Sequence, residues 1–274
     1  MANRYFDEKD HSTLYQKYMF SPPESIQEMI YSYLKEKIDE PFGLAVDVGC
    51  GTGKSTRLLA NYFHKVVGID DSEAQINVAK QFSMKPNVSF CVCSAEALPF
   101  QDASVDLVTA SVSAHWFDLE KFLKEVRRVL KPNGCLAVHC FNEDMDLHYE
   151  NDPSERLAGI LPEVWYFLRN IHPNGYAVIK SKYKDIFNAI PFPEKQIYTN
   201  IPDILPLSLP EVMGFIESAC TYQYYFRQNS EAAKGFLEKT NERILEAIEG
   251  LPKEGQFELR KTHVCVLARK PLIN

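Results

Sequence analysis

Hydrophobic and polar positions follow two spacings along the first half of the chain. Short apolar runs with few charges predict buried strands, and apolar residues three or four positions apart predict helices between them. We expect strands at 44–48, 65–69, 88–92, 105–110 and 135–141, and helices at 54–63, 72–83 and 118–130. Uncharged strands separated by helices are typical of a parallel sheet that is covered by helices on both faces.

The second half of the chain has a different pattern. Aromatic residues are dense over 153–190, which predicts helices, and a strand is expected at 194–201. Helices are expected from Ser208 and over 230–249, followed by a strand over 257–268. These elements predict four parts: an N-terminal helical cap (1–40), an α/β core (41–142), a helical lid with the sixth strand inserted (143–255), and a closing strand of the core (256–274).

Composition and charge narrow the classes of function. The 274-residue chain carries a net charge of −7 that both halves share, so binding to nucleic acid is not expected. No apolar run approaches the ~18 residues of a membrane span, so we expect no membrane association. Seven cysteines without metal-ligand spacing indicate reduced thiols in a cytoplasmic protein that binds no metal. A small molecule or a protein surface remains as substrate, and no obligate protein partner is evident.

A glycine-rich loop between the first expected strand and helix carries the most distinctive chemistry. It places Asp47, Gly49, Gly51 and Gly53 at alternating positions. A phosphate-binding loop would need a further glycine at position 48, and a dinucleotide fingerprint would need one at position 54. The methyltransferase loop, D/E-x-G-x-G-x-G, is matched at every position. This loop holds S-adenosylmethionine, whose ammonium and sulfonium suit a nearby acid. A glycine turn without a ligand is the remaining alternative.

Two acids end the second expected strand. Asp70 lies 23 residues after Asp47, and an acid about 20 residues beyond such a loop typically accepts hydrogen bonds from ribose hydroxyls. Asp71 lies in the same turn and can share this role. A helix-capping aspartate and a magnesium-binding acid of a nucleotidase are the alternatives for Asp70.

Further segments resemble the type 11 S-adenosylmethionine-dependent methyltransferases. They are residues 47–53, 94–100, 117–118 and 129–134. The segment His115-Trp116-Phe117-Asp118 and the N-terminal residues 15–23 resemble the trans-aconitate methyltransferase group. The resemblance implies a doubly wound α/β fold with a mostly parallel seven-stranded sheet, ordered 3-2-1-4-5-7-6, whose last strand is antiparallel. It also implies S-adenosylmethionine as cofactor.

The resemblance implies further cofactor contacts, from Ser94, Ala95, Glu96, Ser111 and Trp116. Ser94 stands where many relatives carry an aspartate that accepts a hydrogen bond from the adenine amino group. The backbone N–H of Ala95 remains available to an adenine ring nitrogen. Trp116 suits either the cofactor or the hydrophobic core.

Methyl transfer from a sulfonium mainly needs alignment and exclusion of water. A carboxylate acceptor needs no base, whereas a hydroxyl or phenol does. His115 is the candidate base or positioning group, with a histidine held by loop backbone as the alternative. Substrate contacts are expected from Tyr15, Tyr18, His139 and Phe141, each of which also suits plain packing. We therefore expect a methyltransferase that acts on a small molecule, with O-methylation of a carboxylate or a hydroxyl among the reactions considered. A protein methyltransferase and a non-catalytic cofactor-binding module are the alternatives.

Overall fold

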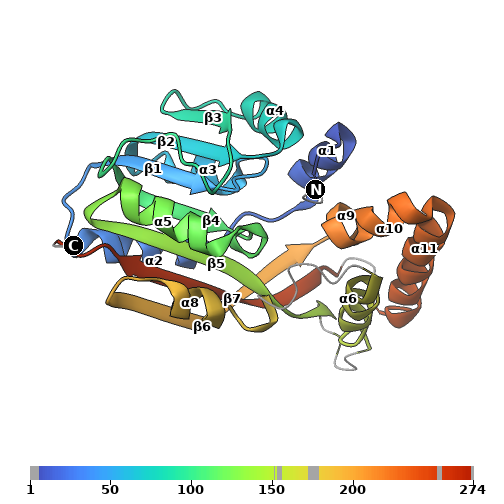
Figure 1. Cartoon of the computed structure of the whole chain (residues 1–274). Helices are drawn as coiled ribbons and strands as arrows, with labels where there is room; N and C mark the ends of the chain where they lie inside the picture. The colour runs from blue at the N-terminus through green and yellow to red at the C-terminus, as the bar shows by residue number, and fades with distance from the viewer. Residues whose placement is uncertain (1–5, 151, 153–155, 172–178, 252–254, 273–274) are drawn as a thin grey trace.

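A seven-stranded sheet forms the centre of the molecule (Figure 1). The computed structural model describes residues 6–150, 152, 156–171, 179–251 and 255–272. The strand order is β3-β2-β1-β4-β5-β7-β6. β7 is antiparallel to both of its neighbours, and the other pairs are parallel. The expected sheet order and the antiparallel last strand are therefore confirmed.

The boundaries of the elements follow the sequence patterns closely in the first half. The strands are β1 (Phe42–Val48), β2 (Phe63–Asp70), β3 (Val88–Val92), β4 (Val105–Ser111), β5 (Leu130–Tyr149), β6 (Glu194–Leu207) and β7 (Phe257–Arg269). The helices are α1 (Lys9–Tyr18), α2 (Glu24–Lys35), α3 (Lys54–Leu59), α4 (Glu73–Gln81), α5 (Leu119–Val129), α6 (Ile160–Ile171), α8 (Lys184–Ala189), α9 (Leu209–Ser218), α10 (Cys220–Gln228) and α11 (Ser230–Ala247), with a 3₁₀ turn η1 (Ala114–Trp116).

Helices cover both faces of the sheet, as a doubly wound fold requires. On one face, Phe122 of α5 and Ile186 of α8 are buried against β1, β4 and β5. On the other face, Ile30 of α2 and Leu59 of α3 are buried against the opposite side chains of the same strands. Both layers consist of fully or almost fully buried apolar residues. This double burial explains why the core strands carry so few charges.

The long strands β5, β6 and β7 extend beyond the α/β core and carry the helices α6, α9, α10 and α11 at their far ends (Figure 1). These parts share a second hydrophobic cluster that includes Leu147, Trp165 and Phe215. This second cluster includes much of the segment 143–255, for which a helical lid was expected. Not all of 143–255 contributes to it, because Tyr183, Ile186 and the following residues up to Phe192 pack on the core instead.

Three expected elements have different lengths in the structure. β5 continues to Tyr149 because Met145, Leu147 and Tyr149 alternate with polar residues, which is the pattern of a half-buried strand. β6 continues to Leu207 although it contains two prolines, which an edge strand tolerates. The third expected element, the helix at 54–63, ends at Leu59, because Phe63 begins β2.

The predicted helices over 153–190 are only partly present. α6 and α8 are found, but a turn with Lys182 and Tyr183 at positive φ separates α8 from the residues before it. Positions 153–155 and 172–178 of this prediction lie outside the described residues, as do positions 1–5 of the expected N-terminal cap. Among the helices that the structure describes, none has the length and apolar character needed to cross a bilayer.

Candidate active site

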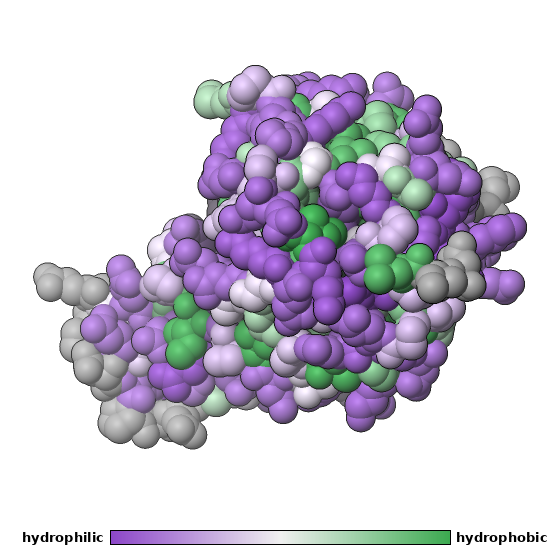
Figure 2. Space-filling view, turned by 90° about the vertical axis from the view of Figure 1, so that its left-hand side faces the viewer, coloured by the Kyte–Doolittle hydropathy of each residue, from purple (hydrophilic) through white to green (hydrophobic). Residues whose placement is uncertain are grey.

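A cavity of about 380 Å³ lies at the carboxyl ends of the parallel strands. This volume falls within the range of small-molecule sites, and this end of an open α/β sheet is where ligands bind. The glycine loop, the end of β2 and the segment after β4 form one side. The N-terminal segment and side chains of β5 and β7 form the other, with Tyr15, Phe20, Phe141 and Lys261 among them. The face at the left of Figure 1, at the opposite end of the strands, is mostly hydrophilic (Figure 2).

The glycine loop adopts a backbone that side chains rarely allow. Gly49, Gly51 and Gly53 have φ angles of +65°, +54° and +79°. A Cβ on Gly49 would lie 2.5 Å from Cβ of Ser113, and one on Gly53 would lie 2.5 Å from the Phe90 ring. A Cβ on Gly51 would meet nothing closer than 3.5 Å. Gly49 and Gly51 line the cavity, whereas Gly53 ends the loop as the N-cap of α3.

Asp47 lies beneath this loop and does not line the cavity. It is fully buried, and its Oδ2 accepts a hydrogen bond of 2.6 Å from Thr56 Oγ1 in α3. Burial raises the pKa of the Asp47 carboxyl to about 7, against the opposing effect of the Thr56 hydroxyl. Asp47 therefore joins the end of β1 to α3 and supports the position of the loop.

Asp70 lines the cavity and organises the backbone around it. Its Oδ2 accepts a hydrogen bond of 2.8 Å from the N–H of Gly51, and its Oδ1 accepts one of 2.9 Å from the N–H of Ser72. Burial raises the pKa of this carboxyl to about 6. Asp71 also lines the cavity. The capping role considered from the sequence falls mainly to Ser72, whose Oγ accepts from the N–H of Gln75.

The residues on this side of the cavity fit S-adenosylmethionine. A Cβ on Gly51 would make only ordinary contacts, with Gln75 at 3.5 Å and Tyr15 at 3.8 Å, so the backbone at this point of the cavity wall is not crowded and a ligand can approach it. Thr52 Oγ1 and Gln75 Oε1 are buried without a partner among the described residues, and both residues line the cavity. Asp70 and Asp71 suit a ligand with hydroxyls and positive charge, and they would repel the phosphates of a nucleotide.

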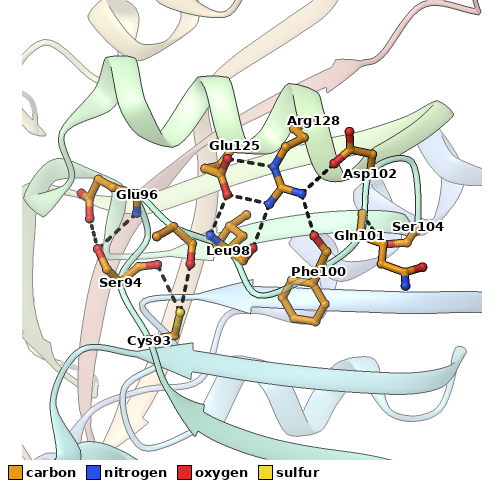
Figure 3. Close-up of polar contacts among 11 residues, drawn as sticks. Cys93, Ser94, Glu96, Leu98, Phe100, Gln101, Asp102, Ser104, Glu125 and Arg128 are labelled. Carbon is orange, nitrogen blue, oxygen red and sulfur yellow. Dashed lines mark hydrogen bonds and ion pairs between the residues drawn. The ribbon is translucent and has the colours of Figure 1, made fainter.

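Ser94, Ala95 and Glu96 lie in a loop that does not line the cavity. Ser94 Oγ donates a hydrogen bond to the Glu96 carboxylate (Figure 3). Oε1 of Glu96 also accepts a hydrogen bond from the N–H of Asp118. Glu125 and Arg128 of α5 hold the rest of this loop through its backbone (Figure 3). Ser111 and Trp116, in contrast, do line the cavity. The structure therefore brings together only part of the expected cofactor contacts.

His115 does not line the cavity. Its Nδ1 lies 3.0 Å from the hydroxyl of Tyr183, which is fully buried at the start of α8. Burial lowers the pKa of the His115 imidazole to about 3. This geometry argues against the expected catalytic role. The partner is the side chain of Tyr183 and not the loop backbone of the alternative.

Of the four residues expected to contact the substrate, three line the cavity and one does not. Tyr15, His139 and Phe141 line the cavity. Tyr18 does not, because its ring packs on Gly214 of α9, where a Cβ would lie 2.4 Å from ring atoms. Burial raises the pKa of the Tyr15 hydroxyl well above its ordinary value, so this group stays protonated.

A buried polar cluster in the cavity wall was not expected from the sequence. Asp203 Oδ2 accepts hydrogen bonds from Lys261 Nζ and from His263 Nε2, the latter over 2.9 Å. All three residues are buried, and Lys261 and His263 line the cavity. Alternate positions in the expected last strand place Lys261 and His263 on one face. That signal was available in the sequence, whereas the pairing with Asp203 requires the register of β6 on β7.

Within the described ranges, no group of three or more histidine, cysteine, aspartate or glutamate side chains is arranged to hold a metal ion. The seven cysteines all lie in described segments, and each has a free thiol.

Comparison with known proteins identifies the chemistry of the α/β core. Residues 46–138 match the family model of the methyltransferase domain. A protein of Dictyostelium discoideum that carries the name of a methyltransferase is 28% identical over 250 residues, which is 88% of this chain and 87% of that protein.

Solved structures agree on the fold. A type II methyltransferase structure from Anaeromyxobacter dehalogenans superposes with a TM-score of 0.68 at 23% identity, over 89% of this chain and 96% of that chain. Phosphoethanolamine N-methyltransferase 2 of Haemonchus contortus, solved with S-adenosyl-L-methionine, superposes with a TM-score of 0.52 at 18% identity, over 98% of this chain and 59% of that chain. The matched domain and the Dictyostelium relative make the chain an S-adenosylmethionine-dependent methyltransferase, with S-adenosylmethionine as its cofactor. The solved structures add agreement on the fold.

Proposed function

We propose that this enzyme transfers a methyl group to an oxygen of a small molecule. One observation carries the proposal: the glycine loop with Asp70 and the wall formed by Phe20, Phe141 and His263 belong to one cavity. A cofactor held at the loop would face an acceptor held against that wall. The cavity volume of about 380 Å³ suits small ligands rather than a folded protein surface.

The cofactor side of the cavity has the groups that this role requires. S-adenosylmethionine, when bound, supplies an activated methyl group on a sulfonium. Gly49 and Gly51 let it approach the backbone, and Asp70 orients the N–H of Gly51 while its carboxylate oxygens retain further lone pairs for ribose hydroxyls. Ser111 and Trp116 extend the same wall.

The acceptor side combines apolar rings with a few polar atoms. Met19, Phe20 and Phe141 line it and would exclude water from the reacting groups. Phe20 comes from the segment between α1 and α2, so the N-terminal cap contributes directly to this wall. His139 is buried and lines the cavity, and its Nδ1 has no partner within the described part of the chain. These atoms favour a compact acceptor with a polar group among apolar atoms.

The identity of the acceptor is a finer question. The resemblance of residues 115–118 to the trans-aconitate methyltransferase group supports a carboxylate as acceptor. The unpartnered imidazole of His139 in the cavity wall supports a hydroxyl instead. The seven free thiols support a cytoplasmic site of action.

A transfer assay tests this proposal. The full chain is incubated with S-adenosylmethionine labelled on its methyl group and with two fractions of a cell extract, one of metabolites and one of macromolecules. We expect labelled product in the metabolite fraction, with the methyl group on oxygen by mass spectrometry. Label in the macromolecular fraction alone would instead indicate a protein methyltransferase. Cofactor binding without transfer to either fraction would indicate a non-catalytic module.

A further inference from the structure

The strongest unexplained feature of the cavity is the cluster of Asp203, Lys261 and His263. Asp203 on β6 is paired with Lys261 on the antiparallel strand β7, and His263 lies two positions further along β7, opposite Ile201. The side chains of Lys261 and Asp203 are 1% and 8% exposed, so water does not screen this ion pair. Buried charges of this kind cost free energy, which raises the question of what the cluster does for the cavity.

The contacts of Asp203 determine which nitrogen of His263 carries the proton. Burial works to raise the pKa of the Asp203 carboxyl, but the hydrogen bonds from His263 and Lys261 outweigh it and hold this pKa below the ordinary value. Asp203 is therefore ionised and can only accept hydrogen bonds. Since Nε2 of His263 lies 2.9 Å from Oδ2, Nε2 must carry the proton. Lys261 Nζ, 3.2 Å from the same nitrogen, then donates to Asp203 rather than to the imidazole.

The other nitrogen of His263 is consequently a lone-pair acceptor. Nδ1 is buried and has no partner among the described residues. His263 itself is 2% exposed and lines the cavity. A carboxylate acceptor has no proton to offer this lone pair, whereas a hydroxyl or phenol does. The arrangement of carboxylate, Nε2–H and free Nδ1 is the one that prepares an imidazole to act as a general base.

We propose that His263 is the general base of the transfer, that Asp203 is its positioning residue, and that the acceptor is an alcohol or a phenol. This inference rests on the proposed function and deepens it. The acceptor oxygen gives its proton to Nδ1 of His263 and donates an electron pair to the methyl carbon of the cofactor. The bond from that carbon to sulfur breaks, and its electron pair stays on the sulfur. The products are a methyl ether, S-adenosylhomocysteine and an imidazolium whose charge lies beside the Asp203 carboxylate.

The charges around His263 predict how the reaction depends on pH. Burial lowers the pKa of the His263 imidazole, the Asp203 carboxylate opposes this effect, and the Lys261 ammonium adds to it. His139, the other imidazole in the wall, is held neutral by burial, which lowers its pKa to about 3. The rate should therefore fall on the acidic side as His263 becomes protonated. Asp203→Asn should move this fall to lower pH, and Lys261→Met should move it to higher pH.

The activity test uses two panels of probes with matched carbon skeletons, one of phenols and alcohols and one of the corresponding carboxylic acids. Wild-type enzyme should methylate members of the first panel. His263→Gln should lose ~10²–10⁴-fold in rate and lose the acidic limb of the pH profile. His64→Gln is the matched control, because His64 is exposed at the start of β2 and should retain the wild-type rate and profile.

The outcomes separate this inference from the function on which it rests. Transfer to the carboxylic acids alone, or an unchanged rate in His263→Gln, would overturn the base and leave the methyltransferase proposal standing. Transfer to neither panel would contradict both proposals.

A measurement without turnover tests the tautomer itself. Nitrogen-15 spectra of the imidazoles, assigned with His263→Gln, should show Nδ1 of His263 unprotonated and Nε2 protonated at neutral pH in the full chain. Asp203→Asn should weaken this preference. A protonated Nδ1 in the wild-type protein would overturn the proposal, since that nitrogen could not accept a proton from the acceptor.

Discussion

Asp203 accepts hydrogen bonds through one carboxylate oxygen from both Lys261 and His263, which lie 58 and 60 positions away in the sequence. The side chains of Asp203 and Lys261 are buried at paired positions of β6 and β7. Removal of one partner leaves the other charge in a site from which water is excluded.

We therefore expect Asp203→Leu to lower the free energy of unfolding by ~3–5 kcal/mol. The double variant Asp203→Leu with Lys261→Met should lose clearly less, because it leaves no unpaired buried charge. Urea unfolding of the two proteins and of Lys261→Met measures the coupling. A double variant that loses the sum of its single changes would contradict the account of this pair.

The glycine loop offers a matched pair of variants. Gly53→Ala would put a methyl group 2.5 Å from the Phe90 ring, away from the cavity, and should cost ~1–3 kcal/mol of stability from overpacking. In Gly51→Ala, the new Cβ would lie 3.5 Å from its nearest neighbour, Oε1 of Gln75, so this change should cost less stability. Its methyl group, however, enters the cavity wall. Calorimetry should therefore find the larger loss of cofactor affinity in Gly51→Ala. Equal affinity for the wild type and Gly51→Ala would remove this glycine from the site.

Asp47 should make the stability of the cofactor-free protein depend on pH. Its carboxyl ionises near pH 7 in the folded protein, well above the ordinary value of 3.8. Between pH 3.8 and about pH 7, Asp47 keeps its proton in the folded protein, whereas the unfolded chain has released it. The free energy of unfolding therefore falls as the pH rises through this range. Thermal unfolding of Asp47→Asn should show a stability gain over the wild type that grows from pH 4 to pH 7.5. A difference that is constant over this range would contradict the raised pKa.

His115 should behave as a structural residue. His115→Gln removes or weakens the contact with the Tyr183 hydroxyl and should cost ~1 kcal/mol of stability. Its transfer rate, measured with the acceptor that the assay identifies, should stay within about twofold of the wild type. A loss of ~10²-fold or more without loss of fold would restore His115 as a catalytic candidate.

Local patterns in the sequence were sufficient for the strands of the α/β core and for the glycine loop. The loop from Asp47 to Gly53 and the position of Asp70 follow from spacing within short segments, whereas the strand order was implied by the family resemblance. The lengths of β5 and β6 were underestimated, because acidic residues and prolines hid their alternation.

The errors in the site concern contacts between distant segments. The sequence placed His115 near the carboxyl end of β4 but gave no sign that Tyr183 covers it. It contained His263 on an expected strand, but its partner Asp203 is brought beside it only by the register of β6 and β7. A titratable residue is thus easy to find in sequence, whereas the group that orients it is not.

The most direct test of the account is calorimetric titration of S-adenosylmethionine into the wild-type protein and into Asp70→Ala. Asp70 lines the cavity and holds the N–H groups of Gly51 and Ser72, so its loss removes charge-assisted hydrogen bonds worth ~1.5–3 kcal/mol each. The matched control is Asp39→Ala, which changes an exposed carboxylate before β1. We predict binding to the wild type, unchanged affinity in the control and at least about tenfold weaker binding in Asp70→Ala. Wild-type affinity in a folded Asp70→Ala protein would contradict the placement of the cofactor in this cavity.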